Sequence, residues 1–284
     1  MNILNLPMYP WNMEQLAERI EACRKNSFRY LASRDITRFL LHAIDLTSLS
    51  GSDNTGSIAR LCEHAREMVV PEKQCDGPAA VCVFPTFVKQ AKQCLRNTAI
   101  RVASVAGAFP SGQSPIDIKV SEVRYAVQSG ADEIDMVISR GKFLEGNYQE
   151  VFDEIAAIKN ACGTALLKVI LETGELKTPD LIYKASLLSM NAGADFIKTS
   201  TGKIEINATP EAFMVMLDAI VTHYKLTGKK IGIKPAGGIA DTNTAILFLK
   251  ILENVTGEEW LSNRLFRVGT TRLADKIFEE IMRE

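Results

Sequence analysis

Glu133-Ile134-Asp135-Met136-Val137 is one of four short apolar segments of this chain that carry charges where a buried strand ordinarily has none. The other three follow at intervals of about one strand and one helix: Leu166-Leu167-Lys168-Val169-Ile170, Asp195-Phe196-Ile197-Lys198-Thr199 and Ile231-Gly232-Ile233-Lys234-Pro235. A continuous apolar run between turns is typical of a strand covered on both faces. An unpaired ammonium in such a strand is costly unless it finds a partner or loses its proton. Three lysines and one aspartate on successive strands therefore indicate a site for amine chemistry.

The chain around these segments alternates between strand and helix patterns. We expect eight strands, over residues 40–45, 79–84, 100–105, 133–138, 165–171, 195–199, 231–234 and 265–268. Helical segments are expected between them, including residues 87–95, 121–127, 148–159, 181–191, 210–224 and 242–252. This alternation is typical of a parallel sheet, and eight such units fit a closed (β/α)8 barrel, the TIM-barrel architecture of the α/β class.

A helical pattern precedes the predicted barrel. Leu16, Ile20 and Cys23 recur at helical spacing with charges between them, which predicts an extra helix over residues 13–30. The chain shows no Pro/Ser-rich linker and no shift in composition that would separate a second large domain. We therefore expect an N-terminal helical extension over residues 1–35 and one catalytic barrel over residues 36–284.

Side-chain alternation along the strands predicts which way the charges point. In two of the strands the apolar residues on either side of Asp135 and of Lys168 would face the outer helices, so these two charges would face the barrel interior. Lys234 follows the same pattern, whereas Lys198 is less clear because Phe196 shares its face. All four charges lie toward the C-terminal ends of their strands, where barrel enzymes build their active sites.

Composition excludes several kinds of partner and indicates a compartment. The 284 residues carry 33 Lys and Arg against 34 Asp and Glu, a balance that argues against nucleic acid or an anionic membrane as the main partner. No apolar run reaches 18 residues, and the first residues lack the pattern of a signal peptide. The six cysteines form no CxxC pair, and the three histidines are too scattered to suggest a metal site. We expect a cytoplasmic enzyme with reduced thiols.

The lysine–aspartate pattern suits one kind of catalysis in particular. A lysine forms an imine only as the free amine, whereas an ordinary lysine side chain has a pKa of about 10.4 and is protonated at neutral pH. Burial and a second cation nearby both lower that pKa, so neighbouring lysines favour a Schiff-base aldolase. Asp135 would move the protons, directly or through a water. The alternative is a buried ion-pair cluster that only holds the barrel together.

Glycine-containing loops follow the last three predicted strands. They read Ser200-Thr201-Gly202-Lys203, Ala236-Gly237-Gly238 and Gly269-Thr270-Thr271-Arg272. Barrels often bind phosphate in loops of this kind, through backbone N–H groups and a helix N-terminus, and Lys203 and Arg272 could add charge. For any one loop, tight turns at the strand ends are the simpler explanation. Three neighbouring loops of this type favour a phosphate site.

Several of these segments resemble the deoxyribose-phosphate aldolase family. The most distinctive are Phe196-Ile197-Lys198-Thr199-Ser200-Thr201-Gly202-Lys203 and Lys234-Pro235-Ala236-Gly237-Gly238, together with the segment at 133–137. Further similar stretches are Ile44-Asp45-Leu46-Thr47, Ala80-Val81-Cys82-Val83-Phe84-Pro85, Glu172-Thr173-Gly174-Glu175-Leu176 and Asn207-Ala208-Thr209-Pro210. The resemblance extends from about Ile36 to Leu273.

The resemblance implies a role for each charged residue of the predicted site. Lys198 would form the Schiff base, a choice that spacing alone leaves open between Lys198, Lys168 and Lys234. Lys234 would be the second lysine, which lowers the pKa of Lys198, and Asp135 would serve the proton relay. Lys168 would hold Asp135 and a water in place. Asp45 would face the site from the end of the first strand.

The remaining implied contacts are to the substrate and its phosphate. The residues concerned are Thr47, Thr199, Gly202, Lys203, Gly237, Gly238, Gly269, Thr271 and Arg272. The implied reaction is the reversible cleavage of 2-deoxy-D-ribose 5-phosphate to acetaldehyde and D-glyceraldehyde 3-phosphate, with no metal and no organic cofactor. Family members are often dimers, so a homodimer is expected.

Three features depart from the family pattern. Arg272 stands where the eighth loop commonly has Ser, Thr or Gly, and Ile239-Ala240 stands where many members have a hydrophobic residue and then arginine. We therefore expect a phosphate contact to have moved from the seventh loop to the eighth. The last tyrosine is Tyr224, so the terminal tyrosine of some members is expected to be absent.

Other functions fit parts of the pattern. Another class I aldolase or a transaldolase would share the lysine without the two distinctive segments, and substrate profiling separates them. A pyridoxal-phosphate enzyme also combines a barrel lysine with a phosphate site, but it would be yellow as purified. A sugar-phosphate-binding protein without activity would bind ligand and show no turnover.

Overall fold

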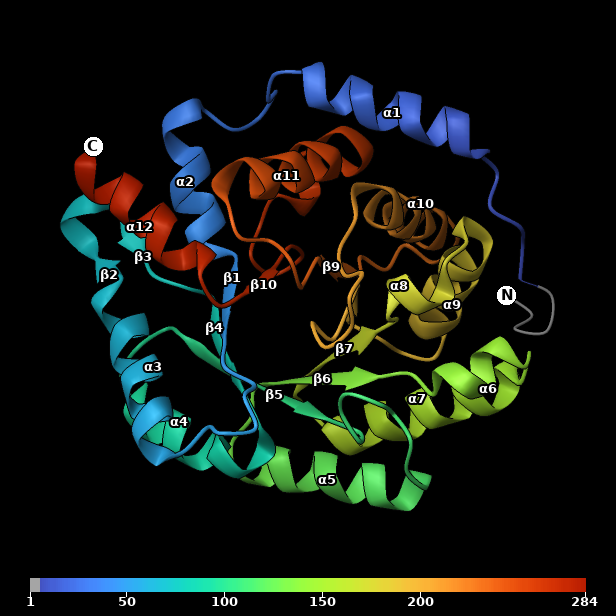
Figure 1. The fold of residues 1–284 in the computed structure, drawn as a ribbon, viewed down its shortest axis with the longest axis horizontal. Coiled ribbons are helices and arrows are strands. Elements are labelled where there is room, and N and C mark those ends of the chain that lie inside the picture. Colours follow the sequence, from blue (N-terminus) through green and yellow to red (C-terminus); the bar gives the residue numbers. More distant parts are fainter. Residues whose placement is uncertain (1–5) are drawn as a thin grey trace.

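Eight parallel strands form the centre of the computed structural model, which describes residues 6–284 (Figure 1). They are β1 (Ile44–Thr47), β4 (Ala80–Val83), β5 (Arg101–Ala106), β6 (Glu133–Val137), β7 (Leu166–Ile170), β8 (Phe196–Lys198), β9 (Gly232–Lys234) and β10 (Val268–Thr270). Their order is β10-β1-β4-β5-β6-β7-β8-β9, and parallel bridges from Ile233 to Phe266 and from Ala236 to Gly269 join the two ends. The predicted (β/α)8 barrel is confirmed.

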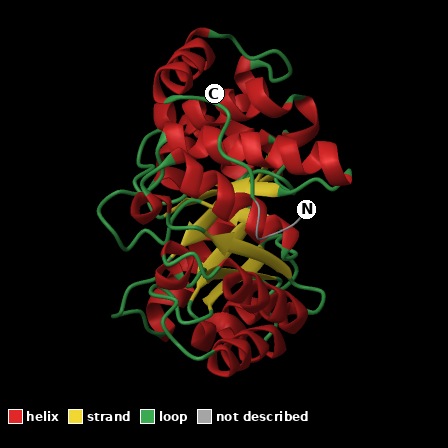
Figure 2. Cartoon of the chain, turned by 90° about the vertical axis from the view of Figure 1, so that its right-hand side faces the viewer, coloured by secondary structure: helices red, strands yellow, loops and turns green. Residues whose placement is uncertain are grey.

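Helices surround the strands on the outside, as the side view in Figure 2 shows. The outer helices are α3 (Thr55–Glu67), α4 (Val88–Cys94), α5 (Ile116–Gln128), α7 (Tyr148–Cys162), α9 (Pro179–Asn191), α10 (Pro210–Thr227), α11 (Thr242–Thr256) and α12 (Leu273–Arg283). The short α6 (Arg140–Leu144) and α8 (Thr173–Leu176) follow β6 and β7 directly. Within residues 6–284, none of the helices combines the length and the apolar character that a membrane span needs.

The N-terminal helix α1 (Met13–Lys25) lies against α10 and α11. It begins at a capping box, in which Asn12 and Gln15 exchange side-chain-to-backbone hydrogen bonds. It ends at Lys25 rather than at residue 30, because Asn26 takes an extended conformation. Arg19 donates two hydrogen bonds of 2.7 Å to Asp218 and so fixes α1 to α10. The predicted extra helix is therefore present, five residues shorter than expected.

The first predicted strand is partly wrong. Residues 40–42 belong to helix α2 (Ser33–His42), and β1 begins only at Ile44. Leu40 and Leu41 are both fully buried, and an apolar run of this kind has the same appearance in a buried helix and in a buried strand. Helix α2 spans the predicted domain boundary at residues 35 and 36. That boundary stays a prediction.

The last predicted strand and several small elements also differ from expectation. The strand expected over residues 265–268 is β10, which begins at Val268. Helices α3 and α12 were not predicted, nor was the hairpin of β2 (Val69–Val70) and β3 (Cys75–Asp76). Three short 3-10 helices complete the described elements: η1 (Pro71–Lys73), η2 (Pro85–Phe87) and η3 (Glu258–Trp260). These differences leave the order of the eight strands unchanged.

The barrel interior has an apolar part and a charged part. A small cluster of Leu49, Ala80, Cys82, Ala103 and Val105 is formed mainly by β4 and β5. The charged side chains come mainly from β1, β6, β7, β8 and β9. Because the residues on the first side are small, long lysine and arginine side chains fit across the barrel on the other.

Phe196 also faces the interior, below Lys198 on the same strand. A Cβ atom at Gly232 would lie 2.3 Å from Cε1 and 2.5 Å from Cδ1 of the Phe196 ring. Phe196 is 1% exposed, so the ring has little room to move. Glycine at position 232 is therefore what allows Phe196 and Lys198 to share one inward face.

We predict that Gly232→Ala destabilises the protein by about 1–3 kcal/mol, the usual cost of overpacking a core. The free energy of urea-induced unfolding measures the effect. Gly141→Ala is the matched control, because no atom lies within 4 Å of the added Cβ, and its stability should not fall. Equal stability of Gly232→Ala and the unchanged protein would contradict the close contact with Phe196.

Candidate active site

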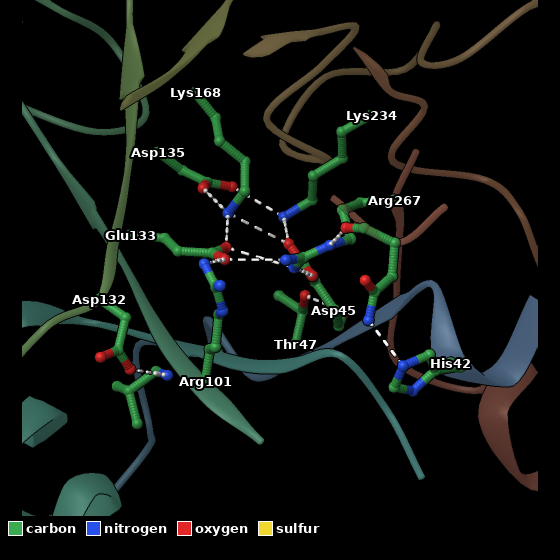
Figure 3. A network of polar contacts seen from close by, with 12 residues as sticks. His42, Asp45, Thr47, Arg101, Asp132, Glu133, Asp135, Lys168, Lys234 and Arg267 are labelled. Carbon is green, nitrogen blue, oxygen red and sulfur yellow. Dashed lines mark hydrogen bonds and ion pairs between the residues drawn. The ribbon is translucent and has the colours of Figure 1, made fainter. Parts of the chain in front are cut away.

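The carboxylate of Asp135 is the common partner of the three barrel lysines. Nζ of Lys168 donates to Oδ1 at 2.8 Å, and Nζ of Lys198 and Nζ of Lys234 each donate to Oδ2 at 2.8 Å. Figure 3 shows Lys168 and Lys234 extending toward Asp135 from neighbouring parts of the barrel wall. The sequence prediction that these residues meet inside the barrel is confirmed by this geometry.

Strand register explains why the four side chains converge. Asp135 of β6 lies beside Lys168 of β7, and Lys198 of β8 lies beside Lys234 of β9. Ile170 is the partner of Lys198, so Lys168 lies two residues lower in the barrel than Lys198. Lys168 and Asp135 lie at the same level, so it is the long side chains of Lys198 and Lys234 that span this difference to reach Asp135.

A second group of charges joins the lysines to the opposite wall. Asp45 of β1 accepts from Nζ of Lys234 at 2.5 Å and lies 3.3 Å from Nζ of Lys168. Glu133 of β6 lies 2.5 Å from Nζ of Lys168. The guanidinium of Arg267 bridges the two carboxylates, at 2.6 Å from Asp45 and 2.8 Å from Glu133 (Figure 3).

Sequence reasoning missed the roles of Glu133 and Arg267, although the signal was present. Glu133 begins the quoted strand, and Arg267 is a lone cation in the apolar segment expected over residues 265–268. Arg267 is 2% exposed and Glu133 is fully buried. A charge in a buried strand was the pattern that indicated the lysines, and it applies equally to these two residues.

The surroundings of the three ammonium groups set their pKa values apart. Burial lowers the pKa of Lys168, but Asp135, Asp45 and Glu133 raise it well above its ordinary value. Burial likewise opposes the charge of Lys234, and Asp135 and Asp45 raise its pKa overall.

Lys198 differs because it contacts one carboxylate, that of Asp135. Burial lowers the pKa of Lys198 below its ordinary value, and the positive charge of Lys234 lowers it further. Asp135 raises it, but by less than these effects combined. Of the three lysines, Lys198 is therefore the one that most readily exists as a free amine.

Lys198 is also the lysine of this cluster that reaches a pocket. The pocket has a volume of about 450 Å³ and lies at the loops after β1, β8, β9 and β10. Its walls include Thr47, Gly202, Lys203, Gly237, Gly238, Gly269, Thr271 and Arg272. The structure thus brings eight of the nine predicted substrate-binding residues together around Lys198.

The ninth, Thr199, lies outside the pocket lining. Its hydroxyl accepts from the backbone N–H of Ala236 at 3.0 Å and donates to the carbonyl of Ala236 at 3.3 Å. Thr199 is fully buried. It therefore joins the end of β8 to the loop after β9 and supports the pocket wall from behind.

The lining residues come from loops with well-defined contacts. Nζ of Lys203 donates to the carbonyl of Leu49 at 2.6 Å, across the pocket from the β1 loop. Thr271 donates to the carbonyl of Thr47 at 3.0 Å. Gly237 has a φ of 81°, and a Cβ atom there would lie 2.5 Å from Oδ1 of Asn207. Arg272 is exposed and directly precedes helix α12.

Glu172 holds the loop after β8 in place. This fully buried residue follows β7 with a left-handed backbone, φ 58°. Its carboxylate accepts from the backbone N–H of Thr201 at 3.0 Å and from the Thr201 hydroxyl at 2.5 Å. Arg140 donates to the same carboxylate at 3.0 Å. Because the hydroxyl of Thr201 accepts from the N–H of Lys203, the contact extends to the pocket wall.

We predict that Glu172→Gln destabilises the protein by about 1–3 kcal/mol, because the amide cannot accept from all of these donors and buried donors are left unpaired. Urea unfolding gives the value. Glu175→Gln is the control: Glu175 contacts the same Arg140 at 3.1 Å, but its side chain is 43% exposed. The control should lose at most about 1 kcal/mol. Equal losses in the two variants would refute the role of Glu172.

The fold and this site together define an α/β-barrel enzyme with a buried lysine of lowered pKa beside a pocket at the C-terminal ends of its strands. The family model described as DeoC/LacD family aldolase matches residues 39–256. The chain therefore belongs to the DeoC/LacD aldolase family, and it is an aldolase.

Individual relatives agree with this assignment. A deoxyribose-phosphate aldolase of Homo sapiens is 43% identical over 278 residues, which cover 93% of this chain and 86% of that protein. A deoxyribose-phosphate aldolase of Mus musculus is 44% identical over 248 residues, which cover 84% and 78% of the two chains. The solved structure of a tetrameric deoxyribose phosphate aldolase from Aeropyrum pernix matches with a TM-score of 0.67 and 25% identity, covering 89% of this chain and 99% of that one.

Proposed function

We propose that this aldolase cleaves 2-deoxy-D-ribose 5-phosphate reversibly to acetaldehyde and D-glyceraldehyde 3-phosphate, through an imine on Lys198. The observation that carries the proposal is the position of Lys198: it lines the pocket, it contacts one carboxylate and its pKa is lowered. The two glycine-rich segments that resemble deoxyribose-phosphate aldolases form the walls around it. The names of the similar proteins favour the same substrate.

The chemistry begins with the amine of Lys198. Its nitrogen adds to the aldehyde carbon C1 of the open-chain sugar, and loss of water gives a protonated imine. Removal of the proton from the C3 hydroxyl then breaks the C2–C3 bond, whose electron pair moves toward the imine nitrogen. The products of this step are D-glyceraldehyde 3-phosphate and an enamine. Protonation at C2 and hydrolysis of the imine release acetaldehyde and restore Lys198.

Asp135 and Lys234 serve the proton transfers of this cycle. Asp135 touches the nitrogen of Lys198 and the nitrogens of both other lysines, so it exchanges protons within the cluster, directly or through a water. The cations around Asp135 hold its pKa well below the ordinary range against the effect of burial, so it starts as a carboxylate. Lys234 stays charged and keeps the amine of Lys198 free. Lys168 and Asp45 hold these groups in place.

The upper part of the pocket suits the phosphate group. Lys203 and Arg272 supply positive charge, and Gly237, Gly238 and Gly269 leave backbone close to the open space. Helix α12 begins at Leu273, next to Arg272, and its N-terminus adds a favourable dipole. In this chain Arg272 takes the place of the arginine expected after Gly238, where Ala240 stands.

The compartment and the assembly are predictions of the same proposal. All six cysteines are free thiols and five of them are buried, which suits a reducing cytoplasm. A homodimer is the expected assembly.

We predict that Lys198→Ala abolishes imine formation and lowers turnover by at least about 1,000-fold, the scale of losing a nucleophile. Borohydride reduction in the presence of acetaldehyde, followed by peptide mass mapping, locates the adduct. Circular dichroism verifies that the variant is folded. An adduct on Lys168 or Lys234 would keep the aldolase class and overturn the choice of Lys198. No adduct in the folded, unchanged protein would favour a binding protein without activity.

We predict that Lys203→Met raises the KM for deoxyribose 5-phosphate by about 10- to 150-fold, the equivalent of one charged hydrogen bond. The value of kcat/KM for unphosphorylated deoxyribose should stay the same, because that sugar has no phosphate to bind. Lys225→Met is the charge-matched control, because it removes the same charge from an exposed lysine. Lys225 lies in the last turn of α10, at the end of the barrel away from the pocket. If Lys203→Met lowered kcat/KM equally for both sugars, the phosphate would have to bind at a place other than Lys203.

A further inference from the structure

We propose that Arg267, which lies outside the substrate pocket, is a positioning residue of this aldolase: its charge completes an ionic balance in the barrel that leaves the amine of Lys198 without a proton. This inference rests on the proposed function, because it concerns how the same lysine becomes reactive. It adds to the site a residue that contacts neither substrate nor Lys198 in the proposed reaction.

The guanidinium of Arg267 is buried inside the barrel and is fixed there by several hydrogen bonds. Arg267 is 2% exposed, and it donates to Asp45 at 2.6 Å and to Glu133 at 2.8 and 3.2 Å. Its Nε also donates to the carbonyl of Asn263, and the guanidinium lies 5.9 Å from the centre of the Phe196 ring. Burial lowers its pKa, but the two carboxylates outweigh this effect and raise the pKa above an already high ordinary value. Arg267 is therefore a permanent buried cation.

Charges inside the barrel balance when Lys198 is neutral. The buried carboxylates are Asp45, Glu133 and Asp135, and the buried cations that contact two or more of them are Lys168, Lys234 and Arg267. Three negative charges thus meet three positive charges. A proton on Lys198 would add a fourth positive charge in a medium of low dielectric constant, which is unfavourable.

Arg267 acts on Lys198 through a continuous set of contacts. It occupies Oδ1 of Asp45, while Oδ2 of Asp45 accepts from Lys234 at 2.5 Å. Lys234 in turn shares Oδ2 of Asp135 with Lys198. Without the charge of Arg267, the carboxylates would outnumber the cations by one, and protonated Lys198 would restore the balance. The charge of Arg267 therefore favours the amine that the reaction needs.

Charged and titratable groups approach Lys198 from every side of the barrel. They are Asp45 of β1, Cys82 of β4, Glu133 and Asp135 of β6, Lys168 of β7, Lys203 after β8, Lys234 of β9, Arg267 before β10 and Arg272 after it. Burial raises the pKa of Cys82 to about 11, so this thiol is neutral at pH 7. Lys203 and Arg272 are cations and oppose protonation of Lys198 in the same sense as Lys234.

Arg101 of β5 contributes little to this balance. Its guanidinium lies 3.3 Å from Glu133, but its side chain is 42% exposed and is therefore screened by water. The balance inside the barrel is set by the three buried cations and the three buried carboxylates. Removal of one member of either set changes the net charge inside the barrel by one elementary charge.

The test is the pH dependence of the rate at which the acetaldehyde imine forms on Lys198, measured by borohydride trapping at a fixed quench pH and mass mapping. In Arg267→Gln the loss of a cation raises the pKa of Lys198. The acidic limb, meaning the part of the pH–rate profile in which the rate rises with pH, therefore moves to higher pH by about one unit. Arg267→Lys keeps the charge and should return the limb toward that of the unchanged protein. A purely structural role of Arg267 would lower the rate at all pH values and leave the limb where it is.

Glu133→Gln gives a matched change of opposite sign. Loss of this carboxylate leaves a surplus positive charge, lowers the pKa of Lys198 and moves the limb to lower pH. The double variant Arg267→Gln/Glu133→Gln restores the balance, so its limb should lie near the original position. If Arg267→Gln does not fold, the directions of the Glu133→Gln and double-variant shifts decide.

The outcomes separate this inference from the proposed function. If all folded variants form an adduct on Lys198 and their acidic limbs lie at the same pH, the role of Arg267 is overturned and the aldolase mechanism stays intact. Failure of the unchanged protein to form an adduct on Lys198 would overturn the proposed function itself. Shifts of opposite sign in the two single variants support the ionic balance.

Discussion

The carboxylate of Asp135, shared by three lysine side chains, is the interaction on which this site depends. Three ammonium groups pointing into one narrow barrel repel each other, and each would be costly to bury alone. Asp135 contacts all three, while Asp45 and Glu133 take up the remaining donors of Lys168 and Lys234. Lys198 is left with the weakest ionic support. The arrangement that makes the cluster stable thus also lowers the pKa of one of its members.

The rest of the barrel is arranged around this cluster. Small residues such as Ala80 and Ala103 line one side of the interior, so the long side chains from the other strands can cross it. Gly232 leaves space for Phe196, whose ring fills the level below Lys198 and lies near Arg267. Above the lysines, Glu172 fixes the loop that carries Lys203. Packing below and hydrogen bonds above hold the amine of Lys198 at the base of the pocket.

Much of the site could be predicted from strand periodicity. Alternation along β6 and β7 indicated correctly that Asp135 and Lys168 face inward, and the positions near the strand ends indicated the C-terminal rim. It failed where a local pattern has two explanations. Leu40 and Leu41 form an apolar run that suits a strand, but they lie in helix α2. The family resemblance, for its part, implied a binding role for Thr199, yet its hydroxyl bonds to Ala236 behind the pocket wall.

The sequence by itself determined the number and order of the barrel strands and that Asp135, Lys168 and Lys234 point into the barrel, because side-chain alternation within a strand is a local property. Only the tertiary structure decided how Lys168, Lys198 and Lys234 differ. Each is a lysine in an apolar strand, and their pKa values depend on how many carboxylates from distant strands surround each nitrogen. The same holds for Arg267, whose partners Asp45 and Glu133 are 222 and 134 residues away in the chain. Contacts at such separations exist only once the barrel has closed.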